Sequence, residues 1–207
     1  MIAIVDYGMG NLFSLASSLK SLGKEVVITG DPEQICKADH IFLPGVGAFG
    51  DASDLLYSTG LADVLKEEAA KGKPLMGICL GMQLLFDRSF EYGEHRGLGL
   101  VPGDVVPMEG YVDADLKVPQ IGWNALHFTG KECPAFENTK EGDYVYFVHS
   151  YYATNCSSNT VATTEYSKDL TAAVCNKNVV GCQFHPEKSG DIGLKILDAF
   201  CNMEAAE

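Results

Sequence analysis

The sequence predicts an α/β fold, in which an open and mostly parallel sheet is flanked by helices and continued by a β-rich antiparallel extension. Short β-branched runs alternate with segments of helical periodicity through residues 1–86, a pattern typical of parallel βα units. Aromatic and β-branched runs then replace the helical periodicity, as in antiparallel strands. Because no linker composition interrupts the chain, we expect a single domain spanning residues 1–207.

The first βα unit is predicted from residues 2–23. Ile2 to Val5 form a short apolar run, and apolar residues recur at helical spacing from Leu12 to Leu22 before Gly23, a residue type that favours a helix C-terminus. The Gly-x-Gly turn between them has neither the third glycine of a dinucleotide fingerprint nor the lysine of a P-loop. It therefore indicates a tight turn rather than a phosphate site.

The next units lead to a glycine-dense loop. Strands are predicted at residues 25–29 and 40–43, and Asp31-Pro32 opens a short helix with an acidic cap and a first-turn proline. Pro44 to Gly50 follows the second of these strands. Open α/β sheets place their sites in loops at the carboxyl ends of parallel strands, so this loop is a candidate. Two further helices are predicted, at residues 52–58 and 61–71.

The stretch from residue 73 to 86 predicts a strand that turns sharply into a helix, with Cys79 at the joint. Its first part is a short apolar run, and apolar residues at helical spacing follow from Leu80. Gly77 and Gly81 would let this nucleophile elbow form without a Cβ clash. A helix start favours the nucleophilic thiolate, although a lone cysteine among apolar residues is more often inert and buried.

Beyond residue 86 the sequence predicts mostly strands. Glycine and proline divide residues 93–109 into short apolar pieces, and β-rich runs follow until a closing amphipathic helix. We expect these strands to continue the same sheet. The predicted strands lie within residues 118–128, 144–153, 160–166 and 171–175, and the helix at 192–203.

Charge and cysteine content exclude several classes of function. The net charge of −13, from 28 acidic and 15 basic residues, argues against nucleic-acid binding, because a phosphate backbone requires a basic face. No apolar stretch approaches the ~18 residues that span a bilayer, and no signal sequence is apparent, so we expect no membrane association and a cytoplasmic location. The seven cysteines form no Cys-x-x-Cys pair, so a structural metal site has little support. No cofactor is predicted.

His185-Pro186-Glu187 follows a predicted strand and could supply a base together with its own orienting carboxylate. In an extended backbone, residues i and i+2 project to the same side, so Glu187 could accept a hydrogen bond from the imidazole of His185. By itself such a tripeptide is more often a surface turn with a chance acidic neighbour. A thiol nucleophile needs an oriented base, however, and the elbow at Cys79 favours the catalytic interpretation.

Acyl transfer also requires hydrogen-bond donors for the developing oxyanion. The amide of Leu80, directly after the candidate nucleophile, would be one donor, and an amide of the Val46-Gly47 loop would be the second. The alternative is that this loop is only a packing turn.

Two motifs, GICLGMQ at residues 77–83 and HPE at 185–187, resemble those of the class I glutamine amidotransferases. Three further stretches, DYGMGNL at 6–12, PQIGWN at 119–124 and HPEKSG at 185–190, are similar to the glutaminase subunits of imidazole glycerol phosphate synthases. The resemblance covers essentially the whole chain. It implies that glutamine is hydrolysed to glutamate and ammonia, for use in histidine biosynthesis.

The resemblance implies a role for each matching residue. Cys79 would form a glutamyl thioester, His185 would act as base and then as acid, and Glu187 would orient the imidazole. The loop of Val46 and Gly47 would form the oxyanion site. Contacts to the substrate glutamine are implied for Gln83, His149, Ser150 and Tyr151.

A protein partner is implied as well. In this family the ammonia passes through a channel into a cyclase subunit with a (β/α)₈ barrel, which makes imidazole glycerol phosphate and aminoimidazole carboxamide ribotide, and the two subunits form a heterodimer. Asn11, Trp123 and Lys188 match positions associated with the partner's face. Trp123 is the only tryptophan, and either an interface role or an ordinary core position is compatible with the sequence.

Three alternatives remain open from the sequence. An amidotransferase subunit for another acceptor, such as the chorismate-using enzymes, would share the triad. A glutamine-binding module with an inactive triad would form no thioester. A cysteine peptidase with the same elbow would need no partner, and the stretch around Trp123 argues against it.

Overall fold

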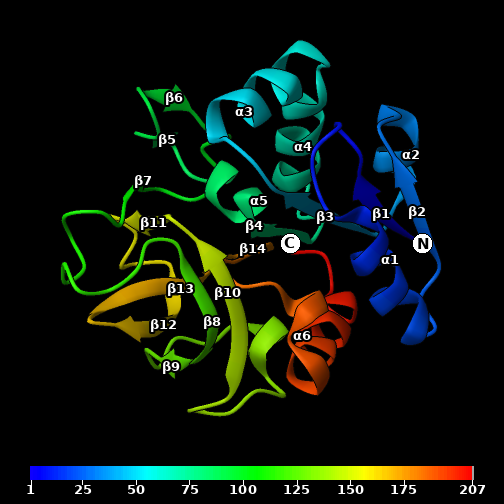
Figure 1. Cartoon of the computed structure of the whole chain (residues 1–207). Helices are drawn as coiled ribbons and strands as arrows, with labels where there is room; N and C mark the ends of the chain where they lie inside the picture. The colour runs from blue at the N-terminus through cyan, green and yellow to red at the C-terminus, as the bar shows by residue number, and fades with distance from the viewer. Residues whose placement is uncertain (207) are drawn as a thin grey trace.

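An eight-stranded sheet forms the centre of the protein in the computed structural model, which describes residues 1–206 (Figure 1). Its strand order is β2-β1-β3-β4-β14-β13-β12-β9. Neighbouring strands from β2 to β14 are parallel, and the pairs beyond β14 are antiparallel. The predicted fold class is therefore confirmed. The strands of this sheet are β1 (Ile2–Val5), β2 (Val26–Thr29), β3 (His40–Gly45), β4 (Leu75–Cys79), β9 (His127–Phe128), β12 (Thr160–Tyr166), β13 (Lys168–Asn176) and β14 (Val179–Cys182).

Helices cover both faces of the parallel part of the sheet (Figure 1). Side chains of α1 and α6 pack in the core on one face, and those of α2, α3 and α4 pack in the core on the other. The helices are α1 (Leu12–Ser21), α2 (Pro32–Lys37), α3 (Phe49–Ser58), α4 (Leu61–Ala70), α5 (Leu80–Leu84) and α6 (Gly190–Cys201), with 3₁₀ turns η1 (Pro134–Phe136) and η2 (Pro186–Lys188).

Strand β1 shows why the parallel strands have uniformly apolar sequences. Ile2 and Ile4 belong to the core beneath α1 and α6, whereas Ala3 and Val5 belong to the core beneath the other helices. Successive side chains of a strand point to opposite faces of the sheet. Because both faces are covered, every position is buried, and a continuous apolar run results.

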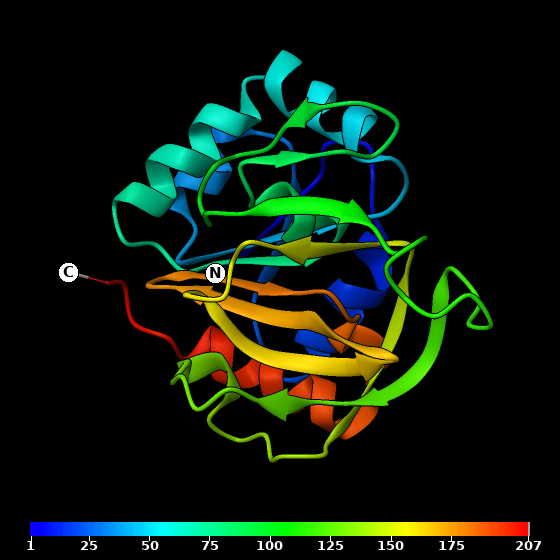
Figure 2. The ribbon, with the colours of Figure 1, turned by 90° about the vertical axis from the view of Figure 1, so that its left-hand side faces the viewer.

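The second half differs from the prediction of one continuous sheet. Strands β9, β12 and β13 extend the large sheet. The other six strands form two smaller sheets, a two-stranded one ordered β10-β8 and a four-stranded one ordered β11-β7-β5-β6 (Figure 2). The sequence pattern indicates strands without indicating their partners, because pairing is decided by register and by which face is buried. These strands are β5 (Arg88–Ser89), β6 (His95–Arg96), β7 (Asp104–Pro107), β8 (Gln120–Ala125), β10 (Tyr144–His149) and β11 (Tyr151–Thr154).

Two helix boundaries near the elbow differ from the predicted ones because of contacts distant in sequence. Helix α3 begins at Phe49 rather than at residue 52, since the carboxylate of Glu91 accepts a hydrogen bond from the Phe49 amide at 2.7 Å. Helix α5 ends at Leu84, whose carbonyl accepts a hydrogen bond from the Leu98 amide at 2.8 Å. Neither contact could be inferred from the local sequence.

Candidate active site

The turn from β4 to α5 places Cys79 at a sharp elbow. Cys79 has φ 55° and ψ −112°, a backbone region that non-glycine residues adopt only when the surrounding structure holds them there. A Cβ at Gly81 would overlap the carbonyl oxygen of Leu43, and one at Gly77 would lie 2.5 Å from the carbonyl oxygen of Gly81. The two glycines therefore allow strand and helix to approach as closely as the elbow requires.

The sheet brings the other candidate segments to this elbow. Strand β3 pairs with β4 on one side, with Gly45 opposite Cys79, so the Val46-Gly47 loop begins beside the sulfur. Strand β14 pairs with β4 on the other side, with Cys182 opposite Ile78. The residues that follow β14 therefore emerge at the same edge, as carboxyl ends of parallel strands do.

His185 and Glu187 form a buried pair beside Cys79. The Nδ1 of His185 lies 2.8 Å from Oε1 of Glu187, and each side chain is only 3% exposed. The backbone differs from the extended form assumed above, because η2 begins at Pro186 and Glu187 reaches the imidazole from a turn. Burial disfavours the imidazolium, but hydrogen bonds with Cys79 and Glu187 outweigh this effect and raise the pKa of His185 to about 9.

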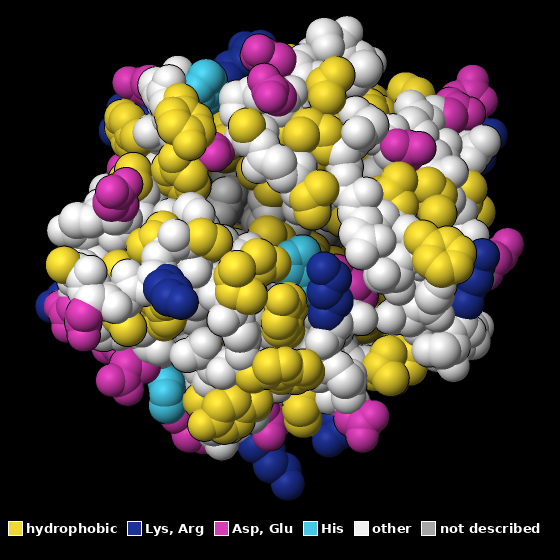
Figure 3. Space-filling model, in the orientation of Figure 1, with side chains coloured by type: hydrophobic (Ala, Val, Ile, Leu, Met, Phe, Trp, Pro, Cys, Tyr) yellow, Lys and Arg dark blue, Asp and Glu magenta, His cyan; other side chains and the backbone are white. Residues whose placement is uncertain are grey.

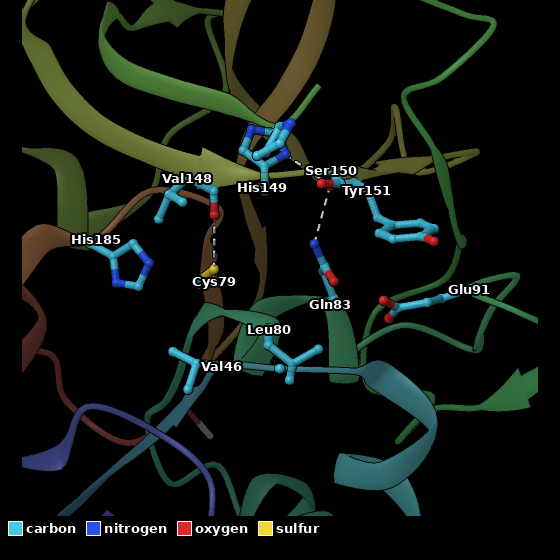
Figure 4. Close-up of a pocket in the computed structure, with 12 residues that line it drawn as sticks. Val46, Cys79, Leu80, Gln83, Glu91, Val148, His149, Ser150, Tyr151 and His185 are labelled. Carbon is cyan, nitrogen blue, oxygen red and sulfur yellow. Dashed lines mark hydrogen bonds between the residues drawn. The ribbon is translucent and has the colours of Figure 1, made fainter. Parts of the chain in front are cut away.

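A cavity of about 310 Å³ opens in front of the sulfur, within the usual range for small-molecule sites, roughly 300–1,000 Å³. Figure 3 shows a hollow near the centre of this face, bordered by many apolar side chains, with a histidine and a basic side chain at its edge. In Figure 4 the ring of His185 points toward Cys79, and Gln83 and Glu91 lie on the other side of the sulfur. The cavity is lined by Val46, Gly47, Cys79, Leu80, Gln83, Glu91, Pro119, Val148, His149, Ser150, Tyr151 and His185.

Two lining side chains are fixed by the carbonyl oxygen of Tyr151. Gln83 donates to it through Nε2 at 3.1 Å, and His149 donates through Nδ1 at 2.8 Å. Burial is the main reason that the pKa of His149 is lowered to about 4, so this imidazole is neutral at pH 7. The Nε2 of His149 has no hydrogen-bond partner among the described residues.

The structure adds residues that the sequence analysis did not single out. Glu91 lines the cavity from the segment after β5, and no local motif marks it. Gln183 is fully buried, and its Nε2 lies 3.8 Å from the Sγ of Cys79. Its position two residues before His185 was the available signal, since alternate residues of an extended segment project to the same side.

The three residues predicted at a partner's face do not line the cavity. Asn11 is the N-cap of α1 and accepts a hydrogen bond from the Ser14 amide at 3.4 Å. Lys188 is exposed directly after the His185–Glu187 pair. Trp123 is 52% exposed, which rules out the core position that the sequence left open.

Comparisons with known proteins identify the family. Residues 3–202 match the family model of glutamine amidotransferase class-I. The chain belongs to this family. It is therefore an enzyme of the glutamine amidotransferase type, and the resemblance to this family that the sequence predicted is confirmed.

Relatives of this amidotransferase match along nearly its whole length. It is 50% identical over 202 residues to the imidazole glycerol phosphate synthase subunit HisH of Sulfurimonas denitrificans, covering 97% of each chain. It is 48% identical over 204 residues to the HisH subunit of Caldanaerobacter subterraneus, covering 98% of each. The HisH subunit of Aquifex aeolicus is 47% identical, covering 95% of this chain and 94% of that one.

Solved structures agree on the fold of the amidotransferase. A crystal structure of a glutamine amidotransferase superposes with a TM-score of 0.75 at 19% identity, covering 97% of this chain and 100% of the other. A PurLQS structure from Thermotoga maritima gives a TM-score of 0.75 at 22% identity, covering 97% of each chain. No helix within residues 1–206 is long and apolar enough to cross a membrane. No group of three or more His, Cys, Asp or Glu in the same range could hold a metal.

Proposed function

We propose that this chain is the glutaminase subunit of an imidazole glycerol phosphate synthase and that Cys79, His185 and Glu187 are its catalytic triad. The observation that carries the proposal is the 50% identity to a HisH subunit over 97% of both chains. The geometry supports it, because Cys79 and His185 line one cavity beside the elbow and Glu187 lies 2.8 Å from the imidazole of His185. A shared triad alone would fit amidotransferases for other acceptors.

In the first half-reaction the thiolate of Cys79 attacks the side-chain amide carbon of glutamine. The carbonyl oxygen becomes negatively charged, and we assign its stabilisation to the amide of Leu80 and an amide of the Val46-Gly47 loop. The imidazolium of His185 then gives its proton to the amide nitrogen, which leaves as ammonia, and a thioester remains on the sulfur. Glu187 holds the ring in position and stabilises its charge.

In the second half-reaction water replaces the ammonia. Neutral His185 takes a proton from the water as its oxygen attacks the thioester carbon. The carbon–sulfur bond then breaks, its electron pair returns to Cys79, and glutamate leaves. The enzyme is thereby restored to the thiolate and imidazolium.

We assign the amino-acid end of glutamine to the side of the cavity away from His185. Both hydrogens of the Gln83 amide are already donated, to Tyr151 O and to Gln183 Oε1, so its carbonyl oxygen is what remains to accept a hydrogen bond from the substrate ammonium. Glu91 lines the same part of the cavity and brings a carboxylate to it. His149, Ser150 and Tyr151 complete this wall.

The proposed heterodimer with a (β/α)₈-barrel cyclase subunit is supported by apolar side chains around the cavity. The outward face of the β8–β10 pair carries Ile121, Trp123 and Tyr144, which are 62%, 52% and 59% exposed. Phe13 in the first turn of α1 is 80% exposed, two positions after the predicted contact residue Asn11. In this assembly ammonia would pass through a channel to the cyclase, which carries the lyase chemistry.

A cytoplasmic location is part of the same proposal. All seven cysteines are free thiols, as expected in a reducing compartment.

The proposal is tested by replacing Cys79 with Ala and assaying the chain together with its cyclase subunit. Without the sulfur no thioester can form, so glutamine-dependent synthesis of imidazole glycerol phosphate should fall by at least about 10⁴-fold. Synthesis from added ammonium salt should be unchanged, because the cyclase then needs no glutaminase.

Two outcomes would contradict the proposal in different ways. Glutamine hydrolysis by the Cys79→Ala variant would show that another residue is the nucleophile. The wild-type chain could instead hydrolyse glutamine but support only a chorismate-using synthase. That result would leave the triad assignment intact and refute the assignment to histidine biosynthesis.

A further inference from the structure

We propose that Gln183 is a further residue of this catalytic site, whose side-chain amide donates a hydrogen bond to the sulfur of Cys79 and stabilises the thiolate. The inference rests on the proposed role of Cys79 as the nucleophile. Gln183 is fully buried, and its Nε2 lies 3.8 Å from Cys79 Sγ. A buried amide beside a reacting sulfur needs an explanation that packing alone does not provide.

The backbone directs Gln183 toward the sulfur. Gln183 follows β14 directly, and its amide donates to the carbonyl of Ala172 at 2.8 Å, which continues the extended pairing. Alternate residues of an extended segment share a side, so Gln183 and His185 both project toward Cys79. Phe184 between them is fully buried in the core beneath α6.

The orientation of the Gln183 amide follows from a backbone carbonyl two hydrogen bonds away. Tyr151 O can only accept, so Gln83 must present its nitrogen to it, at 3.1 Å. The same nitrogen of Gln83 lies 3.0 Å from the Gln183 amide and donates its second hydrogen there, so the receiving atom is the oxygen Oε1. The NH₂ group of Gln183 therefore faces Cys79, and the opposite assignment would place two nitrogens or two oxygens against each other.

The sulfur of Cys79 has contacts that favour opposite protonation states. The carbonyl of Val148 lies 3.7 Å from Sγ and accepts the S–H, so it favours the thiol (Figure 4). His185 favours the thiolate through its positive charge. Helix α5 has only five residues and sums few peptide dipoles. The Gln183 amide is thus the second side-chain group that opposes the Val148 carbonyl.

A donor at the sulfur also assists the breakdown of the thioester. When the carbon–sulfur bond breaks, its electron pair moves to Cys79, and the sulfur leaves as a thiolate. A hydrogen bond from Gln183 stabilises that leaving group, and thiols with a lower pKa leave faster. The same amide therefore acts on both half-reactions without exchanging a proton.

The test compares Gln183→Met with the wild-type chain by the pH dependence of Cys79 alkylation by iodoacetamide, with the labelled residue identified by mass spectrometry. Methionine has a similar length and volume but cannot donate. The pH midpoint should rise by about one unit, so alkylation well below the midpoint should slow about tenfold. The titratable groups around the sulfur are the same in both proteins: Tyr7, Glu91, His149, Tyr151, His185 and Glu187.

Gln120→Met is the matched control. Gln120 is also a fully buried glutamine, but its Nε2 donates to Asn124 at 3.0 Å, not to the sulfur. Its substitution should leave the alkylation midpoint within about 0.2 units of wild type. An unchanged midpoint in Gln183→Met, or an equal shift in both variants, would overturn the inference.

A measurement on the wild-type chain covers the case in which Gln183→Met does not fold. In ¹⁵N-labelled protein the side-chain amide signal of Gln183, assigned with the Gln183→Glu variant, should move with the same pH midpoint as the alkylation. A signal that does not titrate would overturn the inference. Failure of a glutamine-analogue chloroketone to label Cys79 in the wild type would instead overturn the proposed function, so the two are distinguishable.

Discussion

At the scale of single residues, burial and hydrogen bonding give the two histidines of the cavity opposite properties. His185 is paired with Cys79 and Glu187, and its pKa is raised to about 9. His149 is buried against a neutral carbonyl, and its pKa is lowered to about 4, mainly by burial. The first is therefore charged at neutral pH, as the proposed proton transfer to the substrate requires, whereas the second is a neutral donor to a carbonyl in the wall of the cavity.

We expect His149 to make the fold sensitive to acid. Between its folded pKa of about 4 and its unfolded value near 6.5, the unfolded chain binds the extra proton, so stability falls as pH decreases through this window. Lowering the pH from 7 to 5 should cost about 2 kcal/mol of unfolding free energy through this group. Urea titrations of wild type and His149→Gln at both pH values measure the difference.

The control for this prediction is His127→Gln, because the side chain of His127 is 44% exposed and pairs with Glu141 at the surface. It should retain the acid sensitivity of the wild type. His185 acts in the opposite direction, because its folded pKa is raised to about 9 and only the unfolded chain gains a proton between pH 7 and 5, which adds about 1 kcal/mol of stability on acidification. This contribution is the same in wild type and His149→Gln, so it cancels in their comparison. Equal pH dependence in wild type and His149→Gln would contradict the prediction.

At the scale of secondary-structure elements, the site depends on how closely β3, β4 and α5 approach one another. Gly81 lies at the first turn of α5 against the Leu43 carbonyl of β3. The pairing of Gly45 with Cys79 brings the predicted oxyanion loop beside the sulfur. The elbow and this loop therefore share one close contact, and changes in that contact should affect both.

Gly81→Ala is predicted to destabilise the fold strongly. Its Cβ would overlap the Leu43 carbonyl, and the strand or the helix would have to shift, at a cost of about 3 kcal/mol or more. The unfolding free energy should fall by this amount, and Cys79 should become a poor target for alkylation by glutamine analogues. The measurement is a denaturant titration combined with the labelling rate.

Gly130→Ala serves as the comparison for Gly81→Ala. Gly130 has φ +86°, and a Cβ there would meet nothing within 4 Å, so only the backbone preference of glycine is lost, about 1–2 kcal/mol. Similar losses in the two variants would show that overlap with Leu43 is not the decisive factor.

At the scale of the whole molecule, an acidic chain presents an apolar surface beside its cavity. The net charge is −13, yet the outward face of β8 and β10 exposes Trp123, whose ring meets that of Tyr146 edge to face at 6.0 Å. Large exposed aromatic groups are typical of the centre of an interface, and charge repulsion disfavours a second copy of this chain there. The proposed cyclase partner would fit both features if it surrounds this surface with basic side chains.

Trp123→Ala is predicted to weaken binding of the cyclase subunit by about 30-fold or more, corresponding to about 2 kcal/mol. The loss arises from apolar area that the partner no longer covers. Isothermal titration calorimetry with the purified cyclase subunit measures it. Ile28→Ala, on the edge strand β2 where Ile28 is 43% exposed, should bind like wild type, and unaltered affinity of Trp123→Ala would place the interface elsewhere.

Local sequence determined the parallel strands, the elbow and the pairing of imidazole and carboxylate within residues 185–187. Buried strands need apolar residues on both faces, and the elbow needs glycine at positions 77 and 81. Short sequence stretches are therefore enough to predict these features. The start of α2, capped by Asp31, was predictable for the same reason. Recognisable motifs then supplied the family.

Only the tertiary structure decided which distant groups meet. Glu91 caps α3 and lines the cavity from 42 residues away in sequence, and Gln183 reaches Cys79 across 104 residues. The division of the second half into separate sheets depended equally on distant pairing. The physical reason is common to all three. A donor forms its hydrogen bond with whichever acceptor lies within about 3 Å, in a side-chain contact or between two strands, and the local sequence does not specify which group that is.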